Sequence, residues 1–346
     1  MAYRLAIIGY GGMGEWHYRN IKERIQEVEV VGVYDLRKER VVKAMEEGLK
    51  GYETLEALLQ DETVDMITIA TPNNFHKELS IAALKAGKHV ICEKPVMMNA
   101  KELEEVMAVQ KETGKLFSVH QNRRWDKDFK IIQQIIKDNN LGRPYYIESR
   151  VQGSRRALHG WRGHKINGGG MLLDWGVHLI DQMLCLIPSE VTEVYGNLLS
   201  VYSDEVDDNF KLTLKFATGE IGVIEVATNC FINQARWHMS CEKGTAMIES
   251  WDCKGKMVSL HTEGDVPWAD EIVYTEAGPT RTMAPRPVHT TKEEALPEVE
   301  THWTEYYKNI VGVIEGREEL IVKPEQALRV LKIIDEVFKM QKGERV

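Results

Sequence analysis

The sequence predicts an α/β protein with an N-terminal parallel sheet wound with helices, followed by an α+β part with a mostly antiparallel sheet. Over residues 1–122, short apolar runs alternate with helix-like stretches, as expected of strands buried on both faces. Residues 191–261 instead hold one alternating run after another, which is typical of antiparallel strands with one covered face. A chain of 346 residues also favours two domains. We therefore expect domains over residues 1–122 and 123–346.

The first domain contains five runs with the composition of buried strands. They cover residues 5–9, 28–35, 64–71, 88–95 and 115–121. Each run is followed by a stretch with helical spacing, and parallel strands need such crossover helices. The order of these runs predicts a single parallel sheet wound with helices.

The second domain begins with helical patterns and continues with strands. Residues 124–142 predict an amphipathic helix that ends at Gly142, with Pro144 just beyond it. A second helix is expected over residues 168–187. Strands are expected over residues 145–153, 210–216, 219–228, 235–242, 244–250 and 256–262.

The last part of the chain combines an irregular stretch with two helices. Residues 262–298 hold five of the ten prolines and show little periodicity, so they predict a long irregular loop at the surface or at a subunit contact. Helical spacing returns over residues 299–315 and 324–341.

Composition excludes several classes of protein. The net charge of -9, without a local cluster of lysine and arginine, argues against a nucleic-acid partner. The five cysteines are scattered without a CxxC pair, so a disulfide framework is not expected. No run approaches the roughly 18 apolar residues that span a bilayer, and the N-terminal apolar run is too short for a signal peptide. We expect no membrane partner and a cytoplasmic location.

A glycine motif follows the first predicted strand. Gly9, Gly11 and Gly14 form GxGxxG ahead of a helical segment, where the glycines permit a tight turn, a close approach of a pyrophosphate and helix–strand packing. Asp35 ends the second strand, 21 positions after Gly14, where a carboxylate accepts hydrogen bonds from both ribose hydroxyls of NAD. NAD is favoured, while Arg37 and Arg40, which follow Asp35 closely, leave NADP open.

A lysine ends the fourth of these strands, in the sequence Glu93-Lys94-Pro95. Ligands of open α/β sheets lie outside the carboxyl ends of the strands, so Lys94 is expected near the nicotinamide, where its charge can stabilise a developing alkoxide. An ordinary exposed lysine at a strand end is the competing interpretation. The loop over residues 70–76 lies on the same rim, and its His76 has either a packing or a catalytic role.

The stretch GGGMLLDWGVHLID, residues 168–181, places Asp174 and His178 four residues apart on one predicted helix face. Three interpretations are open: half of a metal site, a buried structural histidine, or a general base oriented by its carboxylate. The metal site lacks a third ligand nearby. The glycines before the helix would let its N-terminus approach substrate and cofactor closely.

Together these motifs resemble one family, the glucose-fructose oxidoreductase, inositol dehydrogenase and rhizopine-catabolism group. The resemblance covers essentially the whole chain and rests on GxGxxG, Asp35, TPNNFH at 71–76, EKP at 93–95 and the DxxxH of residues 174–178. The segment over residues 120–142 is also similar to a bacterial subgroup.

The resemblance implies a Rossmann domain followed by an α+β domain whose large open sheet often mediates homodimers or homotetramers. It implies a catalytic triplet of Lys94, Asp174 and His178, with His178 as the acid/base, and no metal. The residues expected around the cofactor, NAD or NADP, are Gly9, Gly11, Gly12, Met13, Gly14, Asp35, Arg37, Thr71, Pro72, Asn73, His76, Glu93, Lys94, Asn122 and Arg123. Those expected at the substrate are Lys94, Trp161, Arg162, Asp174 and His178.

The expected activity is the reversible oxidation of a ring secondary alcohol of a sugar, glycoside or cyclitol to a ketone. Two alternatives are open. One is a glycosidase or lyase that uses bound NAD for transient oxidation, and the other is a non-catalytic nucleotide-binding sensor. An intact Lys94, Asp174 and His178 set argues against the sensor, because a protein that only binds has no use for it.

Overall fold

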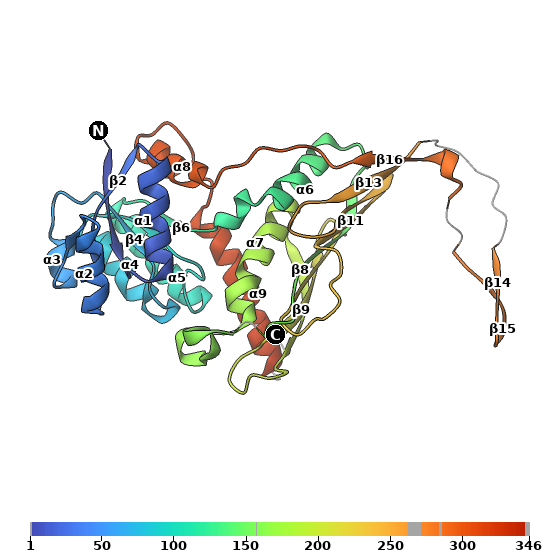
Figure 1. Ribbon diagram of the computed structural model, residues 1–346, viewed down its shortest axis with the longest axis horizontal. Helices are drawn as coiled ribbons and strands as arrows, with labels where there is room; N and C mark the ends of the chain where they lie inside the picture. The colour runs from blue at the N-terminus through green and yellow to red at the C-terminus, as the bar shows by residue number, and fades with distance from the viewer. Residues whose placement is uncertain (1, 157, 262–270, 284–285, 343–346) are drawn as a thin grey trace.

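The computed structural model describes residues 2–156, 158–261, 271–283 and 286–342. It consists of an N-terminal sheet surrounded by helices and a large second sheet that lies beside it (Figure 1). Both expected parts of the fold are thereby confirmed. Nearly all of the buried apolar side chains belong to one contiguous core.

The N-terminal sheet has six parallel strands in the order β3-β2-β1-β4-β5-β6. The strands are β1 (Tyr3–Ile8), β2 (Val28–Tyr34), β3 (Lys50–Gly51), β4 (Met66–Ile69), β5 (His89–Cys92) and β6 (Phe117–Val119). The helices between them are α1 (Gly12–Arg24), α2 (Lys38–Glu46), α3 (Leu55–Leu59), α4 (His76–Lys85) and α5 (Ala100–Thr113), with the 3₁₀ turn η1 (Asn73–Phe75). All five predicted strands are present. The sequence does not predict β3, because two residues carry no periodicity.

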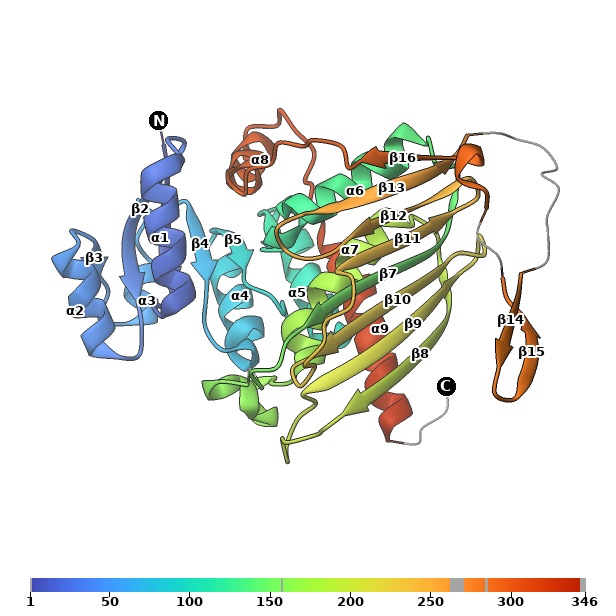
Figure 2. The same ribbon diagram turned by 45° about the vertical axis from the view of Figure 1, so that its right-hand side comes forward.

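The second sheet has eight strands in the order β16-β13-β12-β11-β7-β10-β9-β8. They are β7 (Pro144–Gln152), β8 (Val191–Leu199), β9 (Asn209–Phe216), β10 (Ile221–Ala227), β11 (Trp237–Cys241), β12 (Gly244–Ile248), β13 (Gly255–Leu260) and β16 (Thr291–Ala295). All neighbours pair antiparallel except β7 and β10. Figure 2 shows the sheet from its uncovered side.

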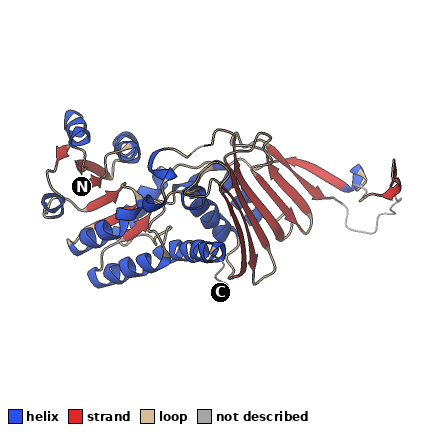
Figure 3. Ribbon diagram, turned by 90° about the horizontal axis from the view of Figure 1, so that it is seen from below, coloured by secondary structure: helices blue, strands red, loops and turns tan. Residues whose placement is uncertain are grey.

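Helices cover only one face of this sheet (Figure 3). They are α6 (Lys127–Asp138), α7 (Val177–Leu186) and α9 (Pro324–Gln341), which contact strands β11, β10 and β8, whereas α8 (Thr304–Ile314) lies against the first sheet. The 3₁₀ turns η2 (Asn122–Trp125), η3 (Gly160–Gly163), η4 (Lys165–Asn167) and η6 (Val288–Thr290) and the π-helical turn η5 (Leu172–Gly176) complete this part. Burial alternates along β9, as expected when one face is covered. None of the described helices is long and apolar enough to cross a lipid bilayer.

Two expectations about the second domain are wrong. The helix expected to end at Gly142 ends at Asp138, because Asn139 takes the left-handed conformation (φ 55°) that stops a helix. The stretch over residues 262–298 is not irregular throughout. It holds the hairpin of β14 (Ile272–Thr275) and β15 (Gly278–Arg281), and also β16. Both faces of the hairpin are exposed, so its sequence shows no alternation of apolar and polar residues. Residues 262–270 and 284–285 lie outside the described residues.

The end of the chain returns to the N-terminal sheet. On α8, Tyr306 donates a hydrogen bond to Ser118 on β6 (3.1 Å), and Tyr307 bonds to His17 on α1 (2.6 Å). On α9, Asp335 accepts a hydrogen bond from the backbone N–H of Ala100 at the start of α5 (2.9 Å). Helix α9, which also packs on β8, thus fastens the second sheet to the first, and α8 packs on the first.

The glycine turn offers a test of packing at the β1–α1 connection. A Cβ on Gly14 would lie 2.2 Å from the carbonyl oxygen of Gly9, whereas a Cβ on Gly12 would meet nothing within 4 Å. We expect Gly14→Ala to lower the stability of the cofactor-free protein by about 1–3 kcal/mol or more, and Gly12→Ala to leave it unchanged or slightly higher. Thermal melts of both variants measure this, and equal melting temperatures would contradict it.

Candidate active site

The glycine turn after β1 has the form that binds a pyrophosphate. Gly9 adopts φ 93°, which favours glycine, and a Cβ there would lie 2.6 Å from the carbonyl oxygen of Ala70. Helix α1 begins at Gly12 without a side-chain cap, so the first N–H groups of the helix are available to an anion. These residues fit the diphosphate of a dinucleotide.

Asp35 lies beside this turn, where the sequence predicts a ribose contact. Its carboxylate accepts hydrogen bonds from the backbone N–H groups of Tyr10 (2.7 Å) and Arg37 (2.8 Å). It also pairs with the guanidinium of Arg40 at 3.1 Å. The rim therefore holds both a carboxylate suited to ribose hydroxyls and an arginine suited to a phosphate.

His76 joins two loops of the rim. Its ring is buried, with Nδ1 2.9 Å from the carbonyl oxygen of Pro95 and Nε2 3.0 Å from that of Thr71. Neither ring nitrogen is left free for the cofactor expected there, so its packing role is the one observed. Asn73 is also engaged, because its amide donates to the carbonyl oxygen of Gly168 (2.9 Å). The peptide bond between Lys94 and Pro95 is cis.

Glu93 points away from the cofactor side, into a buried polar group. Its Oε1 accepts hydrogen bonds from His17 and His120, both at 2.8 Å, and its Oε2 accepts one from the N–H of Lys94 (3.1 Å). Although burial favours the neutral acid, the two imidazoles hold the pKa of Glu93 well below its ordinary value. The carboxylate expected at the cofactor is therefore occupied in holding the end of β5. These three side chains are also of metal-ligating type, but they bond to one another.

Lys94 and Asp174 form the central contact of the site. The Lys94 ammonium donates to a carboxylate oxygen and to the backbone carbonyl oxygen of Asp174, each at 2.8 Å. The Nε of Arg162 lies 3.3 Å from the same carboxylate oxygen. Burial raises the pKa of Asp174, but the two cations outweigh it and hold the pKa below its usual value. The carboxylate is thus ionised at neutral pH and pairs with two neighbouring cations.

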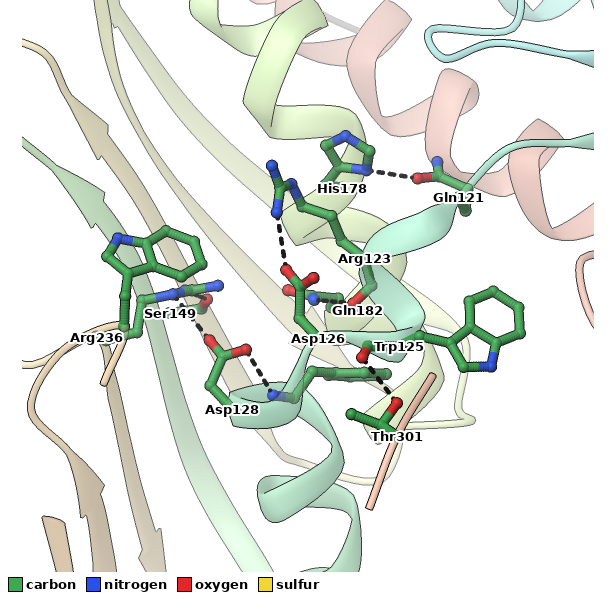
Figure 4. A network of polar contacts seen from close by, with 12 residues as sticks. Gln121, Arg123, Trp125, Asp126, Asp128, Ser149, His178, Gln182, Arg236 and Thr301 are labelled. Carbon is green, nitrogen blue, oxygen red and sulfur yellow. Dashed lines mark hydrogen bonds and ion pairs between the residues drawn. The ribbon is translucent and has the colours of Figure 1, made fainter. Parts of the chain in front are cut away.

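His178 lies on α7, buried and close to these cations. Burial, together with the positive charges of Lys94 and Arg123, holds the pKa of its imidazole well below the ordinary value. Its Nδ1 is 2.8 Å from the amide oxygen of Gln121, which follows β6 (Figure 4). The imidazole is therefore neutral at pH 7, which is the state that a general base needs.

The expected contact between Asp174 and His178 is not formed. Among the described residues, Asp174 bonds to Lys94 and Arg162, and His178 bonds to Gln121. Asp174 lies in the π-helical turn η5, which spans residues 172–176, and its carboxylate is taken by Lys94 after β5, while Gln121 takes the Nδ1 of His178. A spacing of four residues therefore does not by itself join the two side chains.

The three glycines before this helix also differ from expectation. They accommodate protein atoms rather than ligand: a Cβ on Gly168 would lie 2.9 Å from the Asn73 amide nitrogen, and one on Gly169 would lie 2.3 Å from the carbonyl oxygen of Arg162. A Cβ on Gly170 would lie 2.2 Å from the carboxylate of Asp207. The glycines therefore let other parts of the chain close around the start of the helix.

Asp207, which the sequence does not predict, holds that helix start. Its carboxylate accepts a hydrogen bond from the N–H of Leu172 (2.7 Å), and its carbonyl oxygen accepts one from Met171 (3.0 Å). Burial raises the pKa of this carboxyl to about 6. No sequence signal identifies it, because it comes from the β8–β9 connection, far along the chain.

Arg123, Trp175 and Trp251 form an aromatic and cationic wall beside His178. The guanidinium of Arg123 lies 4.4 Å from the ring centre of Trp175 and bonds to Asp126 (3.0 Å; Figure 4). Trp251, in the β12–β13 turn, has its ring centre 5.8 Å from that of Trp175 and is 49% exposed. Sequence reasoning missed both tryptophans, since no spacing relates residue 251 to the helix.

The remaining predicted residues lie at the rim. The guanidinium of Arg162 lies 4.7 Å from the ring centre of Trp161. Trp161 is therefore connected to Asp174 only through Arg162. Asn122 begins η2, and no interaction of its side chain with another described residue is found.

A cavity of about 370 Å³ adjoins this wall. It is lined by the ends of β7 and β10 and by the start of the helix that carries His178, through Val151, Gln152, Gly153, Ser154, Arg155, Met171, Trp175, Val226, Ala227 and Thr228. Its volume suits one small organic molecule. Trp175 is the lining residue that the cavity shares with the wall.

A dinucleotide-binding domain, with a lysine, a carboxylate and a neutral histidine grouped at its strand ends, defines an NAD(P)-dependent dehydrogenase. The chain belongs to the Gfo/Idh/MocA family. Residues 3–121 match the model described as oxidoreductase family, NAD-binding Rossmann fold, and residues 129–247 match the model of the family's C-terminal domain. The enzyme therefore uses NAD or NADP.

Several relatives of the chain are inositol dehydrogenases. The chain is 27% identical over 351 residues to scyllo-inositol 2-dehydrogenase (NADP(+)) IolW of Bacillus subtilis (strain 168), covering 99% of this chain and 94% of that protein. It is 29% identical to myo-inositol 2-dehydrogenase of Thermotoga maritima, over 64% of this chain and 67% of that protein. A crystal structure of an NAD-binding protein from Listeria innocua is 42% identical, with TM-score 0.92 over 99% of this chain and 98% of that chain.

The buried carboxyl of Asp207 predicts a dependence of stability on pH. Because its pKa is about 6 in the folded protein and near 3.9 when unfolded, the native state binds more protons between these values. Its stabilising contribution is therefore present below pH 4 and lost as the pH rises through 6. We therefore expect the melting temperature of the wild type to decrease, relative to that of Asp207→Asn, as the pH rises from 4 to 7.

Asp208→Asn is the matched control. The carboxylate of Asp208 accepts backbone hydrogen bonds from Val201, Tyr202 and Ser203, and although burial raises its pKa, these bonds bring the pKa below its usual value. The difference in melting temperature between Asp208→Asn and the wild type should stay constant between pH 5 and pH 7. A constant difference for Asp207→Asn as well would contradict the role assigned to Asp207.

Proposed function

We propose that the enzyme reversibly oxidises a ring secondary alcohol of a cyclitol, sugar or glycoside to a ketone. The observation that carries this proposal is the grouping of Lys94, Asp174 and a buried neutral His178 at the strand ends of a dinucleotide-binding domain. The inositol dehydrogenases among its relatives support a polyhydroxylated ring as substrate.

His178 is the proposed proton acceptor. Oxidation of an alcohol removes a proton from oxygen and a hydride from carbon, and bound NAD(P) supplies the hydride acceptor. The Nε2 of His178 makes no hydrogen bond to the described residues, so it can receive the hydroxyl proton. In the reverse direction the same atom returns the proton to the alkoxide.

Lys94 is the proposed partner of the alcohol oxygen. Its ammonium has three N–H bonds, and the two contacts with Asp174 use two of them. The third can donate to the substrate oxygen, where positive charge stabilises the negative charge that develops as the proton leaves. Asp174 aims the ammonium, and Arg162 shares the same carboxylate.

The wall and the cavity are the proposed substrate-recognition surface. Trp251 and Trp175 offer apolar faces of the kind that pack against the C–H groups of a sugar or cyclitol ring, while Gln152, Ser154 and Thr228 offer polar groups at the cavity. The proposed preference is for NAD, because Asp35 stands at the ribose position, although its pairing with Arg40 leaves NADP as a second cofactor.

A second copy of the chain is the proposed cover of the open sheet face, giving a homodimer or homotetramer. A Cβ on Gly196 would contact Val337 of α9, so the neighbouring Tyr195 points to the opposite, uncovered face. Tyr195 is 58% exposed there. Large apolar side chains in such positions are typical of subunit contacts.

The activity is tested by a screen for NADH formation at alkaline pH. The substrates are inositols, free sugars, glycosides and sugar acids, each assayed with NAD and in parallel with NADP. We expect stoichiometric reduction of the nucleotide by at least one ring alcohol. Cleavage of a glycoside without net NADH would instead show transient oxidation, and nucleotide binding without any turnover would show a sensor.

The assigned residues are tested by His178→Ala and Lys94→Ala. Each should lower kcat by about 10²–10⁴-fold, since a positioned proton acceptor or charge is lost. NADH binding, followed by fluorescence titration, should change little, because neither side chain forms the glycine turn. Near-normal turnover in both variants would contradict the proposed chemistry.

A further inference from the structure

Gln121 is a buried amide that makes two contacts with the helix of the catalytic histidine. It lies directly after β6 and is 3% exposed. Its amide oxygen is 2.8 Å from the Nδ1 of His178, and its amide nitrogen donates to the carbonyl oxygen of Val177 at 3.3 Å. No motif of the sequence points to it, and the expected orienting group of His178 was Asp174.

The chemistry of the two contacts fixes the direction of both hydrogen bonds. The carbonyl group of Val177 can only accept, so the amide nitrogen of Gln121 must face it. The amide oxygen then faces His178, and the proton between them must belong to Nδ1. In a neutral imidazole this leaves Nε2 as the atom with the free lone pair.

We propose that Gln121 is a positioning residue that holds His178 in its Nδ1–H tautomer and so keeps Nε2 ready to accept the substrate proton. This inference rests on the proposed function, because it concerns the same proton transfer. The contact does not reach the substrate, so Gln121 acts only through His178.

The charges around His178 explain why an amide suits this position better than a carboxylate. The groups that act on the imidazole are Lys94 at the end of β5, Arg123 on η2, Glu93 beside Lys94, and His120 at the end of β6. The first two are cations and oppose a further positive charge. Glu93 is already bonded to His17, His120 and the N–H of Lys94.

A neutral orienting group fixes the tautomer without stabilising the imidazolium. The base therefore stays neutral through the physiological pH range. A carboxylate in place of the amide would accept the same Nδ1–H but would also attract a second proton to the ring. An amide and a carboxylate at position 121 therefore differ in the pH at which His178 becomes protonated.

The test uses two variants and the ring alcohol that turns over in the screen. In Gln121→Glu, the new carboxylate should stabilise the imidazolium and move the acid limb of kcat/KM upward by about one pH unit or more. In Gln121→Leu, the tautomer is no longer fixed, and kcat should fall about tenfold or more, with KM nearly unchanged. Gln60→Glu, at the exposed end of α3, is the control for an added charge and should behave as the wild type.

A second measurement needs no variant at position 121. Nitrogen NMR of the wild type labelled in its histidine rings should show His178, assigned by its loss in His178→Gln, as the neutral Nδ1–H tautomer at pH 7. An Nε2–H tautomer would overturn the proposal. So would wild-type kcat in Gln121→Leu together with an unmoved acid limb in Gln121→Glu. If His178→Ala itself retained turnover, the proposed function would fail instead.

Discussion

The bond between the Lys94 ammonium and Asp174 is the interaction on which the rest of the site depends. It joins the end of β5, in the first sheet, to the helix that carries His178 and packs on the second. Both side chains are mostly shielded from water, at 17% and 16% exposure, so the pair is stronger than one on the surface. The contact between the two halves of the fold thereby sets the position of the Lys94 ammonium.

The surrounding groups are arranged to keep this bond and the nearby histidine in defined charge states. Glu93 is held ionised by the imidazoles of His17 and His120, and Asp207 fixes the first turn of the helix that carries His178. Lys94, one of the two cations that ionise Asp174, also disfavours protonation of His178, together with burial and Arg123. The charge of Lys94 therefore acts both on the proposed base and at the position proposed for the alkoxide.

Much of the fold could be predicted from the sequence, because buried parallel strands and half-covered antiparallel strands leave distinct patterns. The glycine turn was likewise predictable, since its chemistry is contained in six consecutive residues. The partners of Asp174 and His178 were not, because helical spacing suggested that the two pair with each other, whereas Lys94 and Gln121, from other parts of the chain, bind them. Gln121, Asp207 and Trp251 come from distant loops, and only the folded chain brings them to the site.

The central claim is that one substrate hydroxyl meets both Lys94 and His178. A crystal structure of the enzyme with NADH and the unoxidised alcohol tests it most directly, since this combination cannot react forward. The account predicts a ring hydroxyl within about 3.2 Å of both the Lys94 ammonium and the Nε2 of His178, in line with the nicotinamide. A ring bound with its hydroxyls turned away from these two groups would contradict it.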